Sequence, residues 1–182
     1  MMVTNLKLHT QQDNRISKRL KLVEIIILAL LGAIMYVSQV IMAPLPNIEI
    51  VSLLIILTTR RFGYKALLSV YIFAGCEIFT YGIGIWQINY LYVWAILWLI
   101  VFLLKKSDSV ILFTLVSAIF GLLFGTLCSV PYFVIGGIEM GVANIISGIS
   151  FDLLHCGGNA LACILLYKPM TKLFEKLFKP FK

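Results

Sequence analysis

Apolar residues fill most of the chain in six long blocks, separated by short polar or turn-forming stretches. Within each block the apolar positions are continuous, whereas a membrane β-strand would alternate apolar and polar positions. Continuous blocks favour helices that cross a bilayer, and we predict an all-α membrane protein with six transmembrane helices. The predicted spans are 20–42, 48–59, 66–81, 88–104, 110–130 and 142–167, and the breaks include PLPN, RRFGYK, KKSDS and IGGIEMG.

Composition supports the same class. The chain has 182 residues, of which 61% are hydrophobic. A soluble domain is nearer half apolar. The net charge of +7 does not indicate nucleic-acid binding, because the basic residues fall only in the tails and between alternate apolar blocks.

The positions of the basic residues predict the topology. All fifteen lysines and arginines lie between residues 7 and 21, at 60–65, at 105–106 or at 168–182, and the other three loops have none. Positive loops stay in the cytoplasm, so six spans with both termini inside are expected. The chain then divides into a cytoplasmic tail (1–19), a membrane domain (20–167) and a basic amphipathic tail (168–182). In the last, lysine alternates with leucine and phenylalanine at helical spacing, which favours anchoring to anionic headgroups on the inner surface.

The second span is short. Thirteen residues separate Pro46 from Arg60, and a helix of that length reaches only about 20 Å across a hydrocarbon core of about 30 Å. Either the bilayer thins, or the preceding loop APLPNIEI dips into the outer half with Asn47 and Glu49 at membrane depth. A strongly tilted helix behind an ordinary loop is the alternative.

Polar residues also interrupt the sixth span. Gly148, Asp152, His155 and Asn159 follow one another at spacings of four, three and four, which places them on one face of a helix. Because ionisable groups are costly in hydrocarbon, this face should point into the bundle. Asp152 and His155 could bond each other and hold neighbouring helices together, or they could line a cavity that opens to the outside.

Other polar and aromatic residues fall in the same outer half of the membrane. They come from the loop before the second helix, the end of the third helix and the start of the fourth, where Trp98 is expected in the core or facing lipid. Aromatic faces with a few hydrogen-bonding groups suit a small, flat, polar molecule, and the carboxylates suit an amine or protonated ring nitrogen. The predicted binding residues are Asn47, Glu49, Glu77, Trp86, Asn89, Tyr90, Trp94, Asp152, His155 and Asn159.

The first helix carries small residues in the stretch ALLGA. Ala29 and Ala33 are four residues apart and Gly32 lies between them. Small residues at this spacing allow a second helix to approach closely. We therefore consider Ala29, Gly32 and Ala33 as a contact for a partner protein.

Together these features resemble the substrate-binding S-components of energy-coupling factor (ECF) transporters. The resemblance rests on the basic N-terminal tail, six spans in this length, Ala29-xxx-Ala33, PNIEIVSLLI before a short second helix and FDLLHCGGN in the sixth. It implies an outward-open site for a water-soluble vitamin or related micronutrient, but not which one. The aromatic-rich outer face suits a pyridoxine-like or pyrimidine heterocycle. The resemblance also implies a lid at 44–50, a membrane-embedded coupling T-component bound at Ala29 and Ala33, two ATPase subunits and release by toppling in the cell membrane.

The chain shows no signature of chemistry of its own. It has no GxxxxGK[ST] phosphate loop, no Ser/His/Asp or Cys/His order, and no cysteine or histidine spacing typical of zinc. We expect no cofactor, no metal and no enzymatic activity, with ATP hydrolysis in the partner subunits. The alternative function is an autonomous proton-coupled carrier with Asp152 and His155 as the relay. An intramembrane enzyme that uses the same pair as acid and base is less favoured, because no nucleophile or metal accompanies them.

Overall fold

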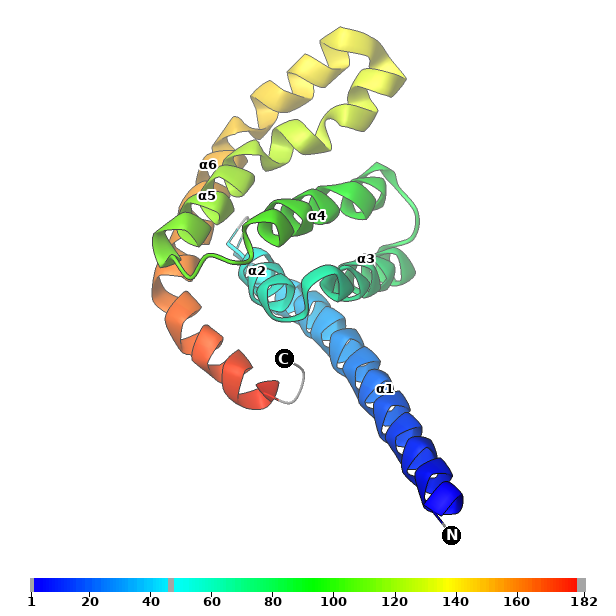
Figure 1. The fold of residues 1–182 in the computed structure, drawn as a ribbon. Helices are drawn as coiled ribbons and strands as arrows, with labels where there is room; N and C mark the ends of the chain where they lie inside the picture. Colours follow the sequence, from blue (N-terminus) through cyan, green and yellow to red (C-terminus); the bar gives the residue numbers. More distant parts are fainter. Residues whose placement is uncertain (1, 46–47, 180–182) are drawn as a thin grey trace.

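The structure is a computed structural model that describes residues 2–45 and 48–179, with side chains from residue 21 onward. The described part is helical throughout and has no strand. Its elements are α1 (Met2–Met42), α2 (Val51–Phe62), the 3-10 turn η1 (Gly63–Ala66), α3 (Leu67–Tyr81), α4 (Ile85–Leu104), α5 (Val110–Cys128) and α6 (Val130–Leu177) (Figure 1). The all-α prediction is confirmed.

Five stretches are long and apolar enough to span a membrane. They are Lys21–Met42, Val51–Tyr81, Ile85–Leu104, Val110–Cys128 and Val130–Leu177. The chain is therefore a multi-pass helical membrane protein. The prediction of six spans counted α2 and α3 separately, whereas together with η1 they form a single candidate stretch of 31 residues.

Contacts between helices define two ends of the bundle. One end, called the basic end below, holds Lys65 Nζ 2.5 Å from Glu24 Oε2, Arg60 Nη1 2.5 Å from Tyr167 Oη, and Trp98 Nε1 3.3 Å from the Gly63 carbonyl. The opposite end, called the cavity end, holds the second halves of α1 and α3 and the first half of α4. Successive helices thus run in alternating directions, while the six-span topology stays a prediction. Which end faces the cytoplasm stays a prediction.

Helix α2 forms the centre of the bundle. Ten of its twelve residues are buried, so it is enclosed on all sides rather than on one face. At 1.5 Å per residue it is about 18 Å long, well short of a hydrocarbon core. The loop that precedes it contributes Leu45, Ile48 and Glu49 to a cavity, which is described below.

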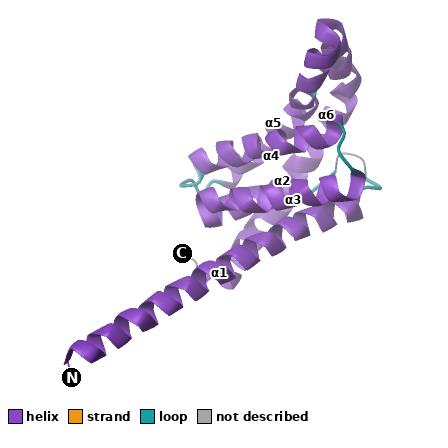
Figure 2. Cartoon of the chain, turned by 90° about the vertical axis from the view of Figure 1, so that its right-hand side faces the viewer, coloured by secondary structure: helices purple, strands orange, loops and turns teal. Residues whose placement is uncertain are grey.

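Helix α1 is longer than predicted, because the N-terminal tail continues the helix back to Met2. Figure 2 shows this half of α1 extending away from the other helices. Its second half packs beside α3, where Ser69 Oγ donates to the Leu28 carbonyl at 2.7 Å and Tyr36 Oη donates to Thr80 Oγ1 at 2.8 Å. The contacts follow the same order along both helices, so α1 and α3 run parallel.

Helices α5 and α6 form one long antiparallel hairpin that reaches beyond α4 (Figure 1). The segment predicted as the loop IGGIEMG is helical, and the reversal occurs at Gly137, whose φ of 70° is a conformation that side-chain-bearing residues avoid. The hairpin closes tightly through glycines. A Cβ at Gly121 would lie 2.8 Å from the His155 backbone, and one at Gly125 would lie 2.7 Å from the Asp152 carboxylate.

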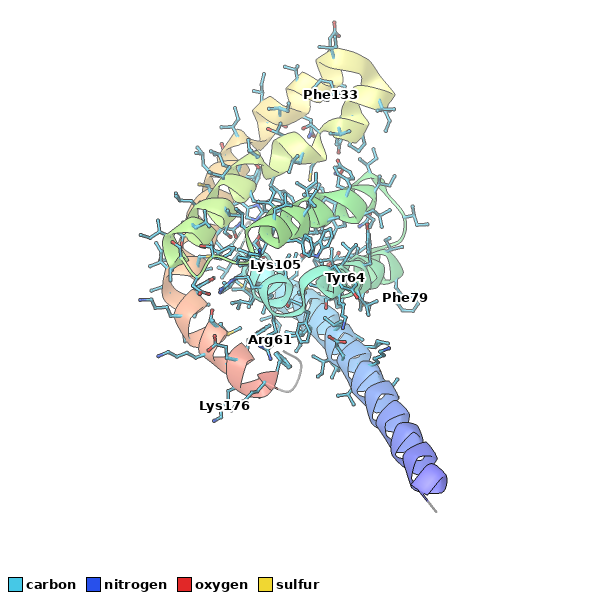
Figure 3. All side chains as sticks on the ribbon, viewed as in Figure 1. Arg61, Tyr64, Phe79, Lys105, Phe133 and Lys176 are labelled. Carbon is cyan, nitrogen blue, oxygen red and sulfur yellow. The ribbon has the colours of Figure 1, made fainter. Side chains whose placement is uncertain are left out.

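After Pro169 the last part of α6 turns back towards α2, as the red segment of Figure 1 shows. Phe178 lies 5.4 Å from Phe62 between ring centroids, and Arg61 donates to the Phe178 carbonyl. Figure 3 places Arg61 between the tail and α2, and Lys176 on the outer side of the tail. The predicted amphipathic tail is therefore a helix whose apolar face is partly used inside the protein.

Candidate functional site

A cavity of about 360 Å³ opens at the cavity end, between the loop before α2 and helices α1, α4, α5 and α6. The end of α1, the loop that follows it, and helices α4, α5 and α6 contribute to its wall. A smaller hollow of about 260 Å³ adjoins it and includes Glu77. The residues that line the larger cavity are Gln39, Met42, Ala43, Leu45, Ile48, Glu49, Trp86, Tyr90, Trp94, Phe124 and His155.

Glu49 connects the loop to α6. Its Oε1 lies 3.2 Å from His155 Nε2, and the two side chains are only 11% and 4% exposed. The same carboxylate accepts from the Ser52 backbone N–H at 2.9 Å, which satisfies a free donor in the first turn of α2. Glu49 is thus held at the cavity by the helix that it caps.

A chain of hydrogen bonds extends from this pair into the core. Ser52 Oγ donates to Glu49 Oε1 at 2.5 Å and accepts from Asn159 Nδ2 at 3.2 Å. Asn159 Nδ2 also donates to the Ser117 carbonyl at 3.1 Å. Asn159 therefore lies behind the cavity wall, where it links α2, α5 and α6 and supports the position of Glu49.

Asp152 does not pair with His155. Its Oδ1 accepts from the Gly125 backbone N–H at 2.8 Å, while His155 bonds Glu49. The interpretation in which the two residues bond each other is therefore wrong. Asp152 joins α5 to α6 in the hairpin, and His155 bonds Glu49 at the cavity. Spacing along α6 placed them on one face correctly, but it could not identify their partners.

Gln39 links α1 to the site and was missed from the sequence. Its Nε2 donates to Tyr90 Oη at 2.7 Å and to Glu77 Oε1 at 3.0 Å. Glu77 is buried, and this bond gives it a polar partner between the two hollows. In the sequence, Gln39 is a single amide close to the end of a largely apolar span. An amide at that place is equally expected at an ordinary helix end, so it did not indicate a site.

Aromatic rings form the rest of the wall. Trp94 lies at the floor with 2% of its surface exposed, and Trp86 lies at the mouth with 48% exposed. Tyr90 lies between them, 6.0 Å from Trp86 and 5.8 Å from Trp94 between ring centroids. Phe124 of α5, which the sequence did not single out, stands 4.8 Å from the His155 ring. The rings pack tilted or edge-on to one another, and the cavity that they line also includes the His155 imidazole and the Glu49 carboxylate.

Of the other predicted residues, Asp152 and Asn159 do not line this cavity, Glu77 lines the adjoining hollow, and Asn89 lines neither. Asn89 is turned towards α5, where it donates to the Cys128 carbonyl at 3.2 Å and accepts from Tyr92 Oη at 2.8 Å. Asn89 is therefore a helix–helix contact. Asn47 lies outside the described residues.

The small residues of α1 have different surroundings. Gly32 faces α3, because a Cβ there would lie 2.6 Å from the Ser69 carbonyl oxygen. The structure thus gives Gly32 a contact inside this chain. Ala29 and Ala33 are partly exposed beside the outer apolar face of α1, and their role in a partner contact stays a prediction.

No family model, curated protein or solved structure matches this chain. Function must therefore be inferred from the geometry. Among the described residues, no group of three or more His, Cys, Asp and Glu could hold a metal ion. What converges is a carboxylate, an imidazole, an amide and a phenol within an aromatic enclosure, which is an arrangement for binding a small molecule.

Proposed function

We propose that this chain is the substrate-binding membrane subunit of an ECF-type importer for a water-soluble vitamin or related micronutrient. The observation that carries the proposal is the convergence of Glu49, His155, Trp86 and Tyr90, from three separate elements, on one cavity. Its volume of about 360 Å³ lies within the range of about 300–1,000 Å³ that is typical of small-molecule sites.

The lining of the cavity supports a planar, polar substrate. Trp86, Tyr90 and Phe124 offer ring faces for stacking, and Gln39 and His155 offer hydrogen bonds at the edge. The Glu49 carboxylate favours a substrate that carries an amine or a protonated ring nitrogen. A pyridoxine-like or pyrimidine heterocycle meets these requirements.

The charge pattern supports an outward-facing site. The cavity lies at the end opposite Arg60, Lys65 and the C-terminal lysines, and positive segments favour the cytoplasm. In the plasma membrane of a bacterium the cavity would then open to the exterior, with the loop at 44–50 as its lid. Ala29 and Ala33 would contact the coupling T-component, two ATPase subunits would supply the energy, and toppling of the subunit would release the substrate inside.

Tryptophan fluorescence tests binding directly, because two of the three tryptophans lie at the cavity and the third lies at the other end of the bundle. Trp86 and Trp94 line the cavity, whereas Trp98 donates to the Gly63 carbonyl at the basic end. A panel of vitamins and precursors should include one compound that changes the emission of the purified protein. The change should persist in Trp98→Phe and fall strongly in Trp86→Phe.

Two results would contradict the proposal. The first is an unchanged emission with every compound of the panel and no small molecule in the purified protein. The second is a signal that depends on Trp98 and not on Trp86, because the compound would then bind away from the cavity.

An autonomous proton-coupled carrier is the second candidate. The observation that favours it is the pair of titratable groups, Glu49 and His155, in contact at the cavity. Transport by the isolated protein in liposomes, driven by a pH gradient without ATPases, would support this candidate over the first.

A further inference from the structure

A second concave surface lies at the basic end, on the outside of the bundle between α5 and α6. It is a groove of about 660 Å³, separate from the cavity described above. Its walls are formed by Ile111, Leu115 and Ile164, which are 74%, 53% and 61% exposed. Because both helices are long and apolar enough to span a membrane, an open apolar groove on their outer surface faces lipid.

The groove runs from an apolar part of α6 to the first basic residue that follows it, where we expect hydrocarbon to give way to headgroups. Ile164 lies one helical turn before Lys168, and Lys168 is the first basic residue after Lys106 along the chain. The neighbouring Tyr167 receives a hydrogen bond from Arg60, which belongs to the basic end. One end of the groove is therefore apolar and the other end carries a cation.

The polar end of the groove has an excess of positive charge. Lys168 and Ser109 line it. After the bend at Pro169, the exposed Lys172 and Lys176 add positive charge at the same end of the bundle. The nearest acid along the chain, Asp108, forms an ion pair with Arg60. This arrangement complements an anion that is attached to a hydrocarbon chain.

We propose that the groove binds an anionic phospholipid. One acyl chain would lie along Ile111, Leu115 and Ile164, and the phosphate would lie between Lys168 and Ser109. Each lysine near an anionic membrane surface adds about 1 kcal/mol of attraction, which is about fivefold in affinity. The proposal is independent of what the cavity binds, since the two sites lie at opposite ends of the bundle.

Native mass spectrometry of the full chain from mixed micelles tests the proposal. With equal amounts of phosphatidylglycerol and phosphatidylcholine, at least one phosphatidylglycerol should stay bound in preference. Lys168→Gln should lower its retention about fivefold, and Leu115→Trp should displace it by filling the groove. Both residues lie at the surface, so both variants should fold.

Matched control variants keep the charge loss and the added bulk but move them away from the groove. Lys21→Gln removes an exposed lysine of α1, which does not line the groove, and Leu103→Trp adds a ring at a position of α4 that is 71% exposed. Neither should change lipid retention. Equal retention of the two lipids would overturn the proposal, as would a loss caused only by Lys168→Gln or only by Leu115→Trp.

A photo-cross-linker at position 115 separates lipid from protein occupants. Cross-links to phosphatidylglycerol in liposomes of that lipid are expected. Cross-links to a second copy of this chain, or to another protein, would show that the groove is a docking surface for a helix and that the lipid proposal is wrong.

Discussion

The hydrogen bonds of Ser52 offer the sharpest test of how the site is held. Ser52 is fully buried, and its hydroxyl donates to Glu49 and accepts from Asn159. Ser52→Ala removes both bonds and leaves part of the polar capacity of each partner unused inside the protein. A hydrogen bond to a charged group contributes about 1.5–3 kcal/mol, so we expect a loss of about 2 kcal/mol in the free energy of unfolding.

Ser117 provides a matched control in the same network. It is also buried, but its hydroxyl has no partner among the described residues, and Asn159 bonds its backbone carbonyl instead. Ser117→Ala keeps that carbonyl and removes a buried hydroxyl that makes no hydrogen bond to the described residues, so it should leave stability unchanged or raise it. The two variants make the same chemical change at two buried serines, and only one of them breaks the network.

Thermal unfolding in a fixed detergent measures the difference. A loss of about 2 kcal/mol in a chain of this size lowers Tm by about 4–8 °C, so Ser52→Ala should melt clearly below Ser117→Ala and the wild type. Equal melting temperatures for the two variants, or a larger loss in Ser117→Ala, would refute the view that Ser52 connects Glu49 to the core.

Three further predictions follow from the geometry. Gly125→Ala should destabilise the protein by about 1–3 kcal/mol, because its Cβ would meet the Asp152 carboxylate. Gly75 has open space around it, so Gly75→Ala should be neutral or stabilising in the same melting assay. A lower Tm for Gly75→Ala than for Gly125→Ala would contradict the close packing of the hairpin. His155→Leu should abolish binding of the substrate found by fluorescence while association with partner subunits is kept; loss of association with binding intact would reverse the assignment. Ala33→Leu should keep substrate binding and block uptake by cells, and normal uptake would remove α1 as the coupling contact.

The helical class was readable from the sequence, because the length and continuity of the apolar blocks depend on the membrane and not on tertiary detail. Helix ends were less predictable. The glycine pair at 136–137 is typical of a loop, yet the helix continues through Gly136 and reverses within one residue at Gly137. That reversal depends on the facing surfaces of α5 and α6, which a local pattern does not contain.

The site was predictable in part for the same reason. Glu49, Tyr90 and His155 are polar or amphipathic residues in or beside predicted spans. The free-energy cost of placing such groups in hydrocarbon indicates that they face the interior of the bundle. Asn89 met the same criterion, but it bonds the Cys128 carbonyl of α5 and the Tyr92 hydroxyl of its own helix. It therefore holds α4 against α5 instead of lining the cavity. Phe124 carried no signal because an apolar ring in a span is equally expected in the core, facing lipid or at a cavity.

The small residues of α5 show what closer reading could have found. Ser117, Gly121, Gly125 and Ser129 recur every four residues and form the face on which α6 packs. The same spacing rule drew attention to α1, where it indicated an external partner. In α5 it marks an internal contact, since Asn144 donates to Ser129 at 2.9 Å. Spacing thus identifies a close helix approach without identifying the partner helix.

The most direct measurement is mass spectrometry of the small molecules that remain with the gently purified protein. We expect one planar, polar compound per chain, present with the wild type and with Trp98→Phe, and lost from Glu49→Gln and Trp86→Phe. A wild-type protein that carries only lipid and detergent, or a compound that the Glu49 and Trp86 variants retain in full, would contradict the claim that these groups form one substrate site.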